Sequence, residues 1–563
     1  MSLPAPISTL PAHDQLVAGL VRHLAAASPG VVPQVVQTHI STVILAGESA
    51  YKLKKPVCLP FLDFSTLAQR RFFCEEELRI NRRTAPQLYL DVLPVTGTVE
   101  APVIGGPGAP LEWMLRMRRF DAAGEFGALA RAGRLQATQV DALAAHLAAF
   151  HLGLPPVDKV QAPDATPAAE RPEVRQAPRK EAWYWAAASL DEIAADPLRP
   201  ATCTQEAVAA VRTALGGQFA RLAPLMAQRR AAGFVRECHG DLHLGNLVDW
   251  HGQVLAFDAI EFDATLRHID IVNDVAFTFM DLRAAGLPAL AWRCINAWAE
   301  HTGDYEGLAL LRTFAAGRAL VRAKVALLSG GDVAGFARYW TLAERLVLPP
   351  PVPRLVLTMG LSGAGKSTVA QGLAEALGAV RVRSDVERKR LHGLAPTARP
   401  GPGADLYGHA ATVRTYARLG ALAEALLAAG LPVIVDAAFL RQDERAALRQ
   451  LALHLGVPFA LVRCVASDAV MQARILARAR TGTDPSDATP DVLALQQRVQ
   501  QALPQDWSPW THEVVNDGTL EALGQQVRAL AAAWAEPGVV QAGVDASKQD
   551  KPIVGGSWVA IDL

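Results

Sequence analysis

Eight consecutive residues carry the clearest chemical signal in the chain. Gly360-Leu-Ser-Gly-Ala-Gly-Lys366-Ser367 fits the pattern G-x-x-x-x-G-K-[ST]; an apolar strand, 355–359, precedes it and a helix-forming segment follows. That order sets a nucleotide's phosphates against the free N–H groups of a helix N-terminus. We expect the glycines to let the backbone wrap the β-phosphate, Lys366 to reach the β- and γ-phosphate oxygens, and Ser367 to bind Mg²⁺. The residues predicted to bind ATP are Gly360, Leu361, Ser362, Gly363, Ala364, Gly365, Lys366, Ser367 and Thr368.

Two carboxylates at predicted strand ends add to this site. Asp436 ends the apolar run 432–436, and a parallel strand beside the P-loop strand brings this carboxylate close to Mg²⁺ or its water shell. Asp385 also ends a strand and precedes a basic helix start that contains Arg388. We expect Asp385 to accept the proton of an attacking hydroxyl and Arg388 to hold an anionic substrate. The alternative for both carboxylates is a capping or turn role.

A third predicted feature of this half is a lid. Arg474 and Arg478 lie four residues apart in a helical pattern, on one face, and the polar loop 481–487 follows. We expect the segment to close these side chains over the transferring phosphoryl group. The alternative is a solvated arginine face.

Together these features resemble the AAA-like predicted kinases, relatives of gluconate, adenylyl-sulfate and polynucleotide kinases. The resemblance covers about residues 354–533 and implies a P-loop domain that transfers phosphate from ATP. The segment Val435-Asp-Ala-Ala-Phe439 differs from the Asp-Asp or Asp-Glu ending that is typical of motor ATPases. This difference favours phosphoryl transfer over mechanical hydrolysis.

A second set of chemically active residues lies in the N-terminal half. His239-Gly-Asp241-Leu-His-Leu-Gly-Asn246 puts a carboxylate and an amide five residues apart, and Asp258 follows after one apolar strand. In kinase-type sites the first aspartate of such a trio orients or deprotonates the acceptor hydroxyl, while the asparagine and the second aspartate bind Mg²⁺. We assign these roles to Asp241, Asn246 and Asp258, and we expect His239 to brace the loop.

The trio resembles the aminoglycoside phosphotransferase-like family, which shares the protein-kinase fold, over about residues 32–346. The resemblance implies that the strand 50–55 carries a phosphate-binding lysine and that the segment 74–78 is the helix whose glutamate positions it. Lys52 and Lys54 share one face of the strand, and Glu76 and Glu77 are adjacent, so both choices stay open. We prefer Lys52 with Glu76.

The elements that must position these residues form two unlike halves. First come short β-like runs (42–46, 50–54, 88–94 and 111–118), then Ala/Leu-rich helical patterns at 139–152 and 295–322. That order predicts a bilobal α+β domain with a small sheet-bearing lobe and a larger helical lobe.

After a proline-rich stretch, β-runs (354–359, 432–436 and 459–465) alternate with helical patterns (367–377, 411–429, 442–455 and 467–479). This alternation predicts an α/β P-loop NTPase domain with a parallel sheet and helices on both faces. We place a kinase-type domain at 1–348, a linker at 349–353, the P-loop kinase domain at 354–535 and a tail at 536–563.

Composition limits the remaining possibilities. With 55 Lys and Arg against 55 Asp and Glu, the chain has no overall field that attracts nucleic acid or anionic lipid. Its six cysteines form no C-x-x-C pair, which argues against a zinc or disulfide framework. Neither a secretory N-terminus nor a run of about 18 apolar residues occurs. These features predict a cytoplasmic protein without membrane spans, and we expect His146 and His151 to be packed or capping histidines.

The motifs favour an ATP-dependent phosphotransferase with two kinase-type domains, each acting on a hydroxyl of a small molecule that no residue identifies. In one alternative, the N-terminal domain is a degenerate kinase fold that senses a ligand and regulates the P-loop domain; the single glycine of the hairpin 42–51 favours it. In another, the P-loop domain phosphorylates nucleic-acid ends through the basic residues 388–390. Zero net charge and the lack of an aromatic-basic groove argue against the second alternative. The sequence indicates no oligomeric state.

Overall fold

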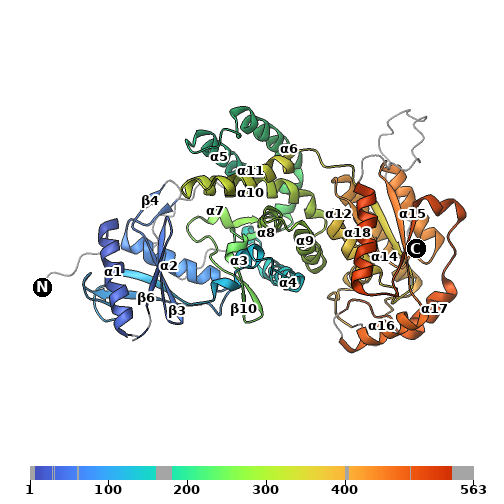
Figure 1. Cartoon of the computed structure of the whole chain (residues 1–563), viewed down its shortest axis with the longest axis horizontal. Coiled ribbons are helices and arrows are strands. Elements are labelled where there is room, and N and C mark those ends of the chain that lie inside the picture. The colour runs from blue at the N-terminus through green and yellow to red at the C-terminus, as the bar shows by residue number, and fades with distance from the viewer. Residues whose placement is uncertain are drawn as a thin grey trace. The chain divides into compact units, whose positions relative to one another are not determined.

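The computed structural model describes residues 7–27, 30, 32–59, 62–159, 181–399, 405–481 and 484–535. The chain forms two compact units, Met1–Pro351 and Val352–Leu563 (Figure 1). Their boundary falls within the predicted linker, 349–353. The predicted tail, 536–563, lies outside the described residues. Among the helices that are described, none is long and apolar enough to cross a membrane.

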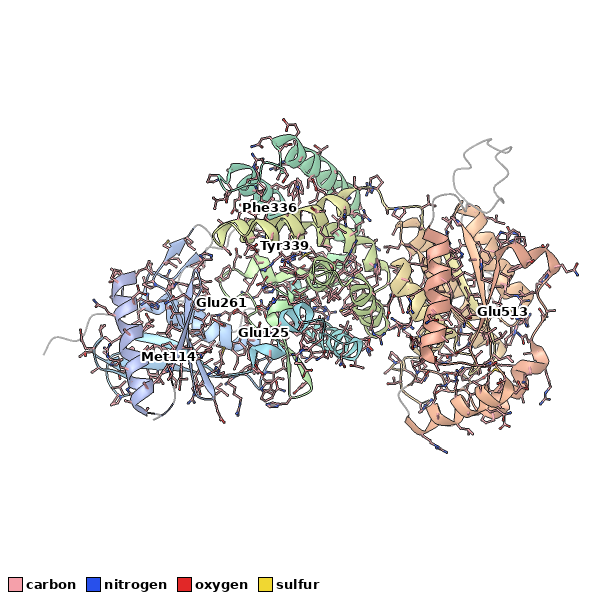
Figure 2. The ribbon with its side chains drawn as sticks, in the orientation of Figure 1. Met114, Glu125, Glu261, Phe336, Tyr339 and Glu513 are labelled. Carbon is pink, nitrogen blue, oxygen red and sulfur yellow. The ribbon has the colours of Figure 1, made fainter. Side chains whose placement is uncertain are left out.

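The N-terminal unit contains a six-stranded antiparallel sheet in the order β1-β2-β3-β8-β6-β7. Met114 and Leu115 are neighbours on β8 and therefore point to opposite faces. Met114, which Figure 2 labels, packs in the cluster that includes α1. Leu115 packs on the other face, toward α2. The sheet is thus covered by a helix on each face. Its elements are α1 (Leu10–Ala27), β1 (Gln34–Gln37), β2 (Ser41–Ala46), β3 (Ser49–Lys54), α2 (Leu67–Asn81), β6 (Tyr89–Gly97), β7 (Pro102–Ile104) and β8 (Glu112–Arg118), with a small hairpin of β4 (Cys58–Leu59) and β5 (Leu62–Asp63).

The rest of this unit is mainly helical and holds two short antiparallel strand pairs. The pair β10 (Leu247–Trp250) and β11 (Gln253–Ala256) separates the loop 239–246 from Asp258, and β9 (Val235–Glu237) pairs with β12 (His268–Asp270). The predicted small-lobe strands are confirmed as β2, β3, β6 and β8. The helices are α3 (Phe126–Arg131), α4 (Ala137–Gly153), α5 (Ala182–Ala195), α6 (Gln205–Ala231), α7 (Ala264–Arg267), α8 (Ile271–Ala284), α9 (Pro288–Thr302), α10 (Leu311–Leu328) and α11 (Val333–Val347).

One helical prediction is wrong in its continuity. The pattern 295–322 is divided between α9 and α10, because Gly303 ends α9 in a left-handed conformation with φ of 77°. A glycine adopts that conformation without steric cost. A short 3₁₀ turn, Glu306–Leu310, then leads into α10. The break lets α10 pack against α8 and α11 independently of α9.

The C-terminal unit is built on a five-stranded parallel sheet in the order β14-β15-β13-β16-β17. Helices α12 and α18 pack together over one face of the sheet, where a core includes Val356, Ile434 and Val462; α14 and α15 pack against the sheet away from that core (Figure 1). The predicted α/β class is confirmed, while β17 was not predicted. The elements are β13 (Leu355–Met359), α12 (Lys366–Leu377), β14 (Val380–Arg383), α13 (Ser384–Leu391), α14 (His409–Ala428), β15 (Val433–Asp436), α15 (Gln442–His454), β16 (Phe459–Val465), α16 (Asp468–Thr481), α17 (Pro490–Val499), β17 (Thr511–Val515) and α18 (Leu520–Ala535).

Candidate functional site

The P-loop connects β13 to α12, and its backbone uses glycines where only glycine fits. Gly360, Gly363 and Gly365 have φ of 149°, 86° and 91°. A Cβ on Gly363 would lie 2.5 Å from the Met471 carbonyl oxygen, and one on Gly365 would lie 1.9 Å from a side-chain nitrogen. Met471 and Asn516 of the same chain therefore pack directly against the P-loop backbone. This packing holds the loop and its N–H groups in a fixed shape.

Lys366 is held across the inside of this loop. Its Nζ donates to the Leu361 carbonyl oxygen at 2.9 Å. Burial lowers the pKa of Lys366, and the nearby Asp436 and Asp385 act in the opposite direction. The Lys366 ammonium donates to a neutral carbonyl oxygen, and the two carboxylates only partly offset its burial. A phosphate bound in the loop would supply a direct anionic partner.

Asp436 lies at the carboxyl end of the sheet, as the strand-end pattern predicts. The parallel register places Thr358 of β13 and Arg383 of β14 opposite Asp436. The Asp436 side chain is buried, Arg383 Nε lies 3.5 Å from its Oδ2, and Thr358 Oγ1 lies 3.4 Å from its Oδ1. These contacts are long, so the carboxylate has room for closer partners. Its predicted role toward Mg²⁺ stays a prediction.

Arg383 is a charged residue of this site that was not predicted. Its guanidinium lies between Asp436 and Asp484, with Nη2 3.9 Å from Asp484 Oδ1. Arg478 contacts the same Asp484 carboxylate at 3.7 Å. The alternation Val380-Arg-Val-Arg383 in a parallel strand is the signal that could have identified it, since buried strands of this kind are otherwise continuously apolar.

Arg474 reaches the P-loop itself rather than solvent. Its Nη1 donates to the Gly363 carbonyl oxygen at 3.3 Å and its Nη2 to Asn516 Oδ1 at 3.2 Å. Asn516 follows β17, was not predicted, and donates from Nδ2 to the Ala364 carbonyl oxygen at 2.9 Å. Helix α16 is thus tied to the P-loop through Arg474. The lid role of Arg474 and Arg478 stays a prediction.

Asp385 and Arg388 lie on the short helix α13, and their surroundings differ. Burial raises the pKa of Asp385, while Arg383, Arg388 and Lys366 oppose that rise. Arg388 is buried, and its Nη1 donates to the Leu406 carbonyl oxygen at 3.0 Å and to Thr412 Oγ1 at 3.3 Å. Arg388 therefore braces the segment around Leu406 in this structure, and its predicted hold on a substrate has no support in these contacts.

In the N-terminal unit, Asp241, His243 and Asn246 form one hydrogen-bonded loop. Asn246 Nδ2 donates to the Asp241 carbonyl oxygen at 3.0 Å and to its Oδ2 at 3.1 Å, and His243 Nε2 lies 3.5 Å from the same Oδ2. Burial raises the pKa of Asp241, but His243 and Arg322 outweigh it and lower the pKa to about 2. Asp241 is therefore a carboxylate at neutral pH.

Lys52 links the sheet to the loop after β11. Its Nζ lies 2.8 Å from Glu77 Oε1 and 2.5 Å from Asp258 Oδ1. Lys54, next along the same face, pairs with the other oxygen of Glu77 at 2.9 Å and with Glu261, which Figure 2 labels. The charges of both lysines are thus matched by buried or half-buried carboxylates.

The predicted pairing of Lys52 with Glu76 is wrong. Glu77 is fully buried against the sheet, whereas Glu76 turns away and pairs with Arg79 at 2.7 Å and with Arg267 at 2.5 Å. Adjacent residues on a helix point about 100° apart, so only one of the two can face β3. The packing of α2 against the sheet selects Glu77.

Asp258 adopts an unusual backbone conformation for an aspartate, with φ of 62°. Its N–H donates to the hydroxyl of Tyr89 at 3.0 Å, and its carboxylate reaches Lys52. Conformations of this kind persist only where the surroundings enforce them, and they cluster at functional sites. The side chain of Asp258 is 46% exposed, so it remains open to a ligand.

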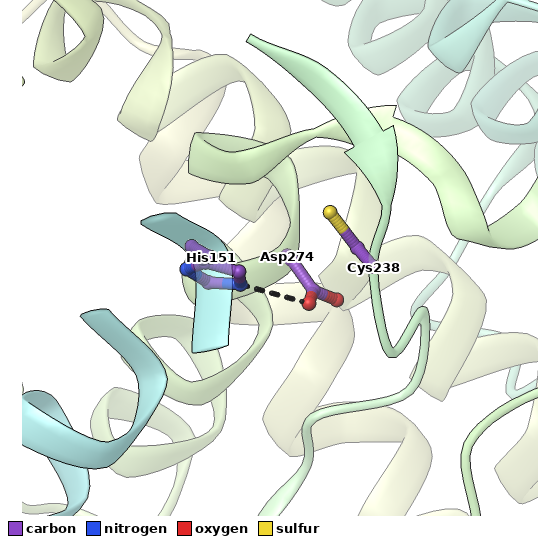
Figure 3. Close-up of side chains that lie close together, drawn as sticks. All are labelled: His151, Cys238 and Asp274. Carbon is purple, nitrogen blue, oxygen red and sulfur yellow. Dashed lines mark hydrogen bonds and ion pairs between the residues drawn. The ribbon is translucent and has the colours of Figure 1, made fainter. Parts of the chain in front are cut away.

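The loop before Asp241 is braced by a buried cluster of His151, Cys238 and Asp274 (Figure 3). Asp274 accepts from the N–H groups of His239 at 3.0 Å and Gly240 at 2.8 Å, and His151 Nε2 lies 3.1 Å from its Oδ2. Trp298 Nε1 donates to His151 Nδ1 at 3.0 Å. Because an indole N–H can only donate, Nε2 carries the imidazole proton. Both ring nitrogens are in use, so the cluster serves as a structural brace.

Comparison with known proteins places the chain in a family. Over 465 residues it is 31% identical to the uncharacterized protein Rv2004c of Mycobacterium tuberculosis strain H37Rv, covering 81% of this chain and 88% of the relative. The chain belongs to the family of this mycobacterial protein. A family described as "AAA domain" matches residues 355–503, which contain the P-loop, and the C-terminal unit is therefore an AAA-type P-loop domain.

Solved structures with similarity to parts of the chain include two kinases. A choline/ethanolamine kinase family protein from Mesorhizobium loti has 13% identity and a TM-score of 0.33, covering 59% of this chain and 99% of its own. A gluconokinase from Sinorhizobium meliloti 1021 has 25% identity and a TM-score of 0.24, covering 33% and 94%. The N-terminal sheet, the helical part and the Lys52–Glu77 pair have the arrangement of a protein-kinase-like fold, so the predicted fold class is confirmed.

The corrected pairing gives a direct prediction. Glu77→Gln is expected to weaken Mg-ATP binding at the N-terminal site by about 10- to 150-fold, the usual worth of a charged hydrogen bond, because Lys52 loses its anchor. Glu76→Gln removes the same charge one residue away and is expected to leave the affinity unchanged. Calorimetric titration of both variants in a Lys366→Ala chain, which isolates this site, makes the comparison. Equal losses in the two variants would contradict the pairing.

Proposed function

We propose that the N-terminal unit transfers the γ-phosphoryl group of ATP to a hydroxyl of a small molecule. The observation that carries the proposal is the bridge that Lys52 makes between Glu77 of α2 and Asp258, next to the loop that holds Asp241. A lysine that meets phosphate oxygens and a carboxylate that meets Mg²⁺ are the parts that this chemistry requires. In this structure the charges of Lys52 and Asp258 neutralise each other. Binding of Mg-ATP would separate the two side chains, with Lys52 on the phosphates and Asp258 on the metal.

The oxygen atoms of Asn246 and Asp258 suit Mg²⁺. Asn246 uses its NH₂ group on Asp241, while its Oδ1 accepts no hydrogen bond from the described residues, and the Asp258 carboxylate is half exposed. Mg²⁺ prefers such oxygen ligands together with substrate phosphates. When bound, it supplies positive charge that offsets the charge of the transferring phosphoryl group.

Asp241 is proposed to orient the acceptor hydroxyl and to take up its proton as the new O–P bond forms. A carboxylate with a pKa of about 2 is a weak base, so it accepts the proton late, after the hydroxyl oxygen has begun to bond to phosphorus. Lys52 holds the phosphates of ATP while the bond to the leaving oxygen breaks. Positioning thus contributes more than base strength.

For the C-terminal unit we propose phosphoryl transfer as well. Lys366 and the loop N–H groups would hold the phosphates of ATP, Ser367 and Asp436 would hold Mg²⁺, and Asp385 would accept the acceptor's proton. The match to an AAA domain supports nucleotide binding here. A screen of sugars, nucleosides, aminoglycosides and oligonucleotides for ATP-dependent phosphorylation, run separately with Lys366→Ala and Asp258→Asn chains, assigns an acceptor to each site.

The proposal for the N-terminal unit is tested by Asp258→Asn in the Lys366→Ala background. Loss of a metal ligand is expected to weaken Mg²⁺-dependent ATP binding at least about tenfold, since even outer-shell partners of metals have effects of that size. Asp263→Asn is the control, because Asp263 caps α7 and asparagine caps equally well. Unchanged binding in Asp258→Asn would refute the metal role.

One observation favours the regulatory alternative for the N-terminal unit. The β2–β3 hairpin closes through only two residues, Gly47 and Glu48, between the paired Ala46 and Ser49. So short a turn offers few N–H groups to phosphates. ATP binding without phosphate transfer to any acceptor, in the same screen, would support a sensing domain over an enzyme.

A further inference from the structure

Helix α10 carries two arginines, one turn apart, whose guanidinium groups are incompletely used. Arg318 is 9% exposed; its Nε donates to Asn273 Oδ1 at 3.0 Å and its guanidinium lies over the ring of Phe277. Arg318 Nη2 and Arg322 Nε are buried and have no hydrogen-bond partner among the described residues. Buried donors of charged groups are costly to leave unpaired, so a partner from outside the chain is expected.

Arg318 lies in the wall of a hollow between the helices of this unit. The hollow is otherwise largely apolar and aromatic, and its described lining contains no aspartate or glutamate. Residues of this lining that define its character are Trp185, Phe219, Leu266, Asn273, Phe314 and Arg318. An apolar hollow with one guanidinium and one amide suits a small organic molecule with a polar end.

A short series of contacts connects the wall of the hollow to the Asp241 loop. Asn273, which accepts from Arg318, is followed on α8 by Asp274, and Asp274 holds the N–H groups of His239 and Gly240. Arg318 and Arg322 both interact electrostatically with the Asp241 carboxylate. The positive charges of both arginines therefore act on the group that is proposed to receive the acceptor's proton.

The carboxylates on this side of the loop are already engaged. Asp274 accepts from two backbone N–H groups, and Asp281 accepts from the Leu244 N–H at 2.8 Å and from the Tyr339 hydroxyl at 2.7 Å (Figure 2 labels Tyr339). Tyr339 also interacts with Arg322. The groups left for a ligand are guanidinium nitrogens. A cationic acceptor would meet like charge here, and an anionic one would meet its counter-charge.

We propose that the acceptor of the N-terminal unit carries an anionic group, a carboxylate or a phosphate, which Arg318 and Arg322 bind so that a hydroxyl of the same molecule faces Asp241. The inference rests on the proposed phosphotransfer and names the substrate class of that site. Arginine suits both anions, since its planar fork donates two parallel hydrogen bonds to either. The two guanidinium groups thereby select against amine-bearing acceptors.

The test uses anion binding, which needs no identified acceptor and no turnover. The full chain with Lys366→Ala, saturated with Mg²⁺ and a non-hydrolysable ATP analogue, is titrated calorimetrically with inorganic phosphate, acetate and tetramethylammonium. Phosphate or acetate is expected to bind and tetramethylammonium is not. Arg318→Gln is expected to weaken anion binding about 10- to 150-fold, because a charged hydrogen bond is lost. Stronger weakening of acetate than of phosphate would assign the carboxylate class, and the reverse would assign the phosphate class.

Two further variants keep the test decisive. Arg322→Gln, on the same helix, is expected to act in the same direction, and it serves if Arg318→Gln lowers the unfolding temperature. Arg221→Gln removes an exposed arginine from α6 and is expected to change nothing. No anion binding, wild-type anion affinity in both the Arg318→Gln and the Arg322→Gln chains, or tighter binding of tetramethylammonium than of the anions would overturn the inference. Unchanged Mg²⁺-dependent ATP binding in the Asp258→Asn chain would instead count against the proposed function, so the two failures are distinguishable.

Discussion

Replacing Lys366 by alanine is expected to weaken Mg-ATP binding at the C-terminal site by about 30- to 4,000-fold. The estimate follows from roughly 2–5 kcal/mol for removing one partner of a buried charge pair. Lys366 is the ammonium inside the P-loop, and burial already lowers its pKa, so phosphate oxygens would be its closest anionic partners. Alanine removes this charge but leaves the loop N–H groups in place.

The measurement is calorimetric titration of the full chain in an Asp258→Asn background, so that only the P-loop site reports. Lys324→Ala is the control, because Lys324 pairs with Glu192 on the surface of the other unit. Wild-type affinity in the Lys366→Ala chain would show that the nucleotide does not use this loop. A loss in both lysine variants would indicate a general effect of charge.

Residues that work within one contiguous segment could be predicted from the sequence. The P-loop and the loop 239–246 each fix their geometry through neighbours in the chain, with glycines at positive φ in the first and a side-chain hydrogen bond from Asn246 to Asp241 in the second. Strand ends such as Asp436 were also predictable, because parallel strands bring their carboxyl ends to one edge. Local chemistry is thus readable where the chain supplies both partners nearby.

Partners that come from distant segments were not predictable in the same way. Glu76 and Glu77 are chemically identical, and only the rotation of α2 against β3 decides which one faces Lys52. Arg383 and Asn516 join the P-loop site through the register of β14 and the position of β17. Sequence periodicity shows that a face is buried, but it does not show which residue of another element lies against it.

The arginines of α10 illustrate the same limit. In the sequence, Arg318 and Arg322 are polar residues within an Ala/Leu-rich helical pattern. That pattern predicted one helix over 295–322, although Gly303 ends α9. In the fold they lie beside α8, where the carboxylates of Asp274 and Asp281 are already used by the Asp241 loop. Among the described residues, Arg318 and Arg322 are left with unpaired donors because these carboxylates already accept hydrogen bonds from the Asp241 loop. A local sequence pattern does not show such contacts between distant segments.

Asp385→Asn is expected to lower turnover at the C-terminal site by about 10²–10⁴-fold, the usual contribution of a general acid or base. Burial raises the pKa of Asp385, which makes it a stronger base than a solvated aspartate. The charged form is the active one, so wild-type turnover should fall as pH decreases through this raised pKa. The residual turnover of the Asp385→Asn variant should not show this decrease at low pH.

Affinity for ATP separates this role from the alternatives. The Asp385 carboxylate interacts electrostatically with Lys366 and would repel phosphate oxygens bound there, so its neutralisation should leave ATP binding unchanged or slightly tighter. Both effects are measured on the Asp385→Asn variant in the Asp258→Asn background: turnover as the rate of ADP formation with the acceptor found by screening, and affinity by ATP titration. Asp491→Asn, a substitution of an exposed residue on α17, is the control. Near-normal turnover would make Asp385 a capping residue of α13. A parallel loss of ATP affinity would instead place it with Asp436 at the magnesium, because a metal ligand affects nucleotide binding and chemistry together.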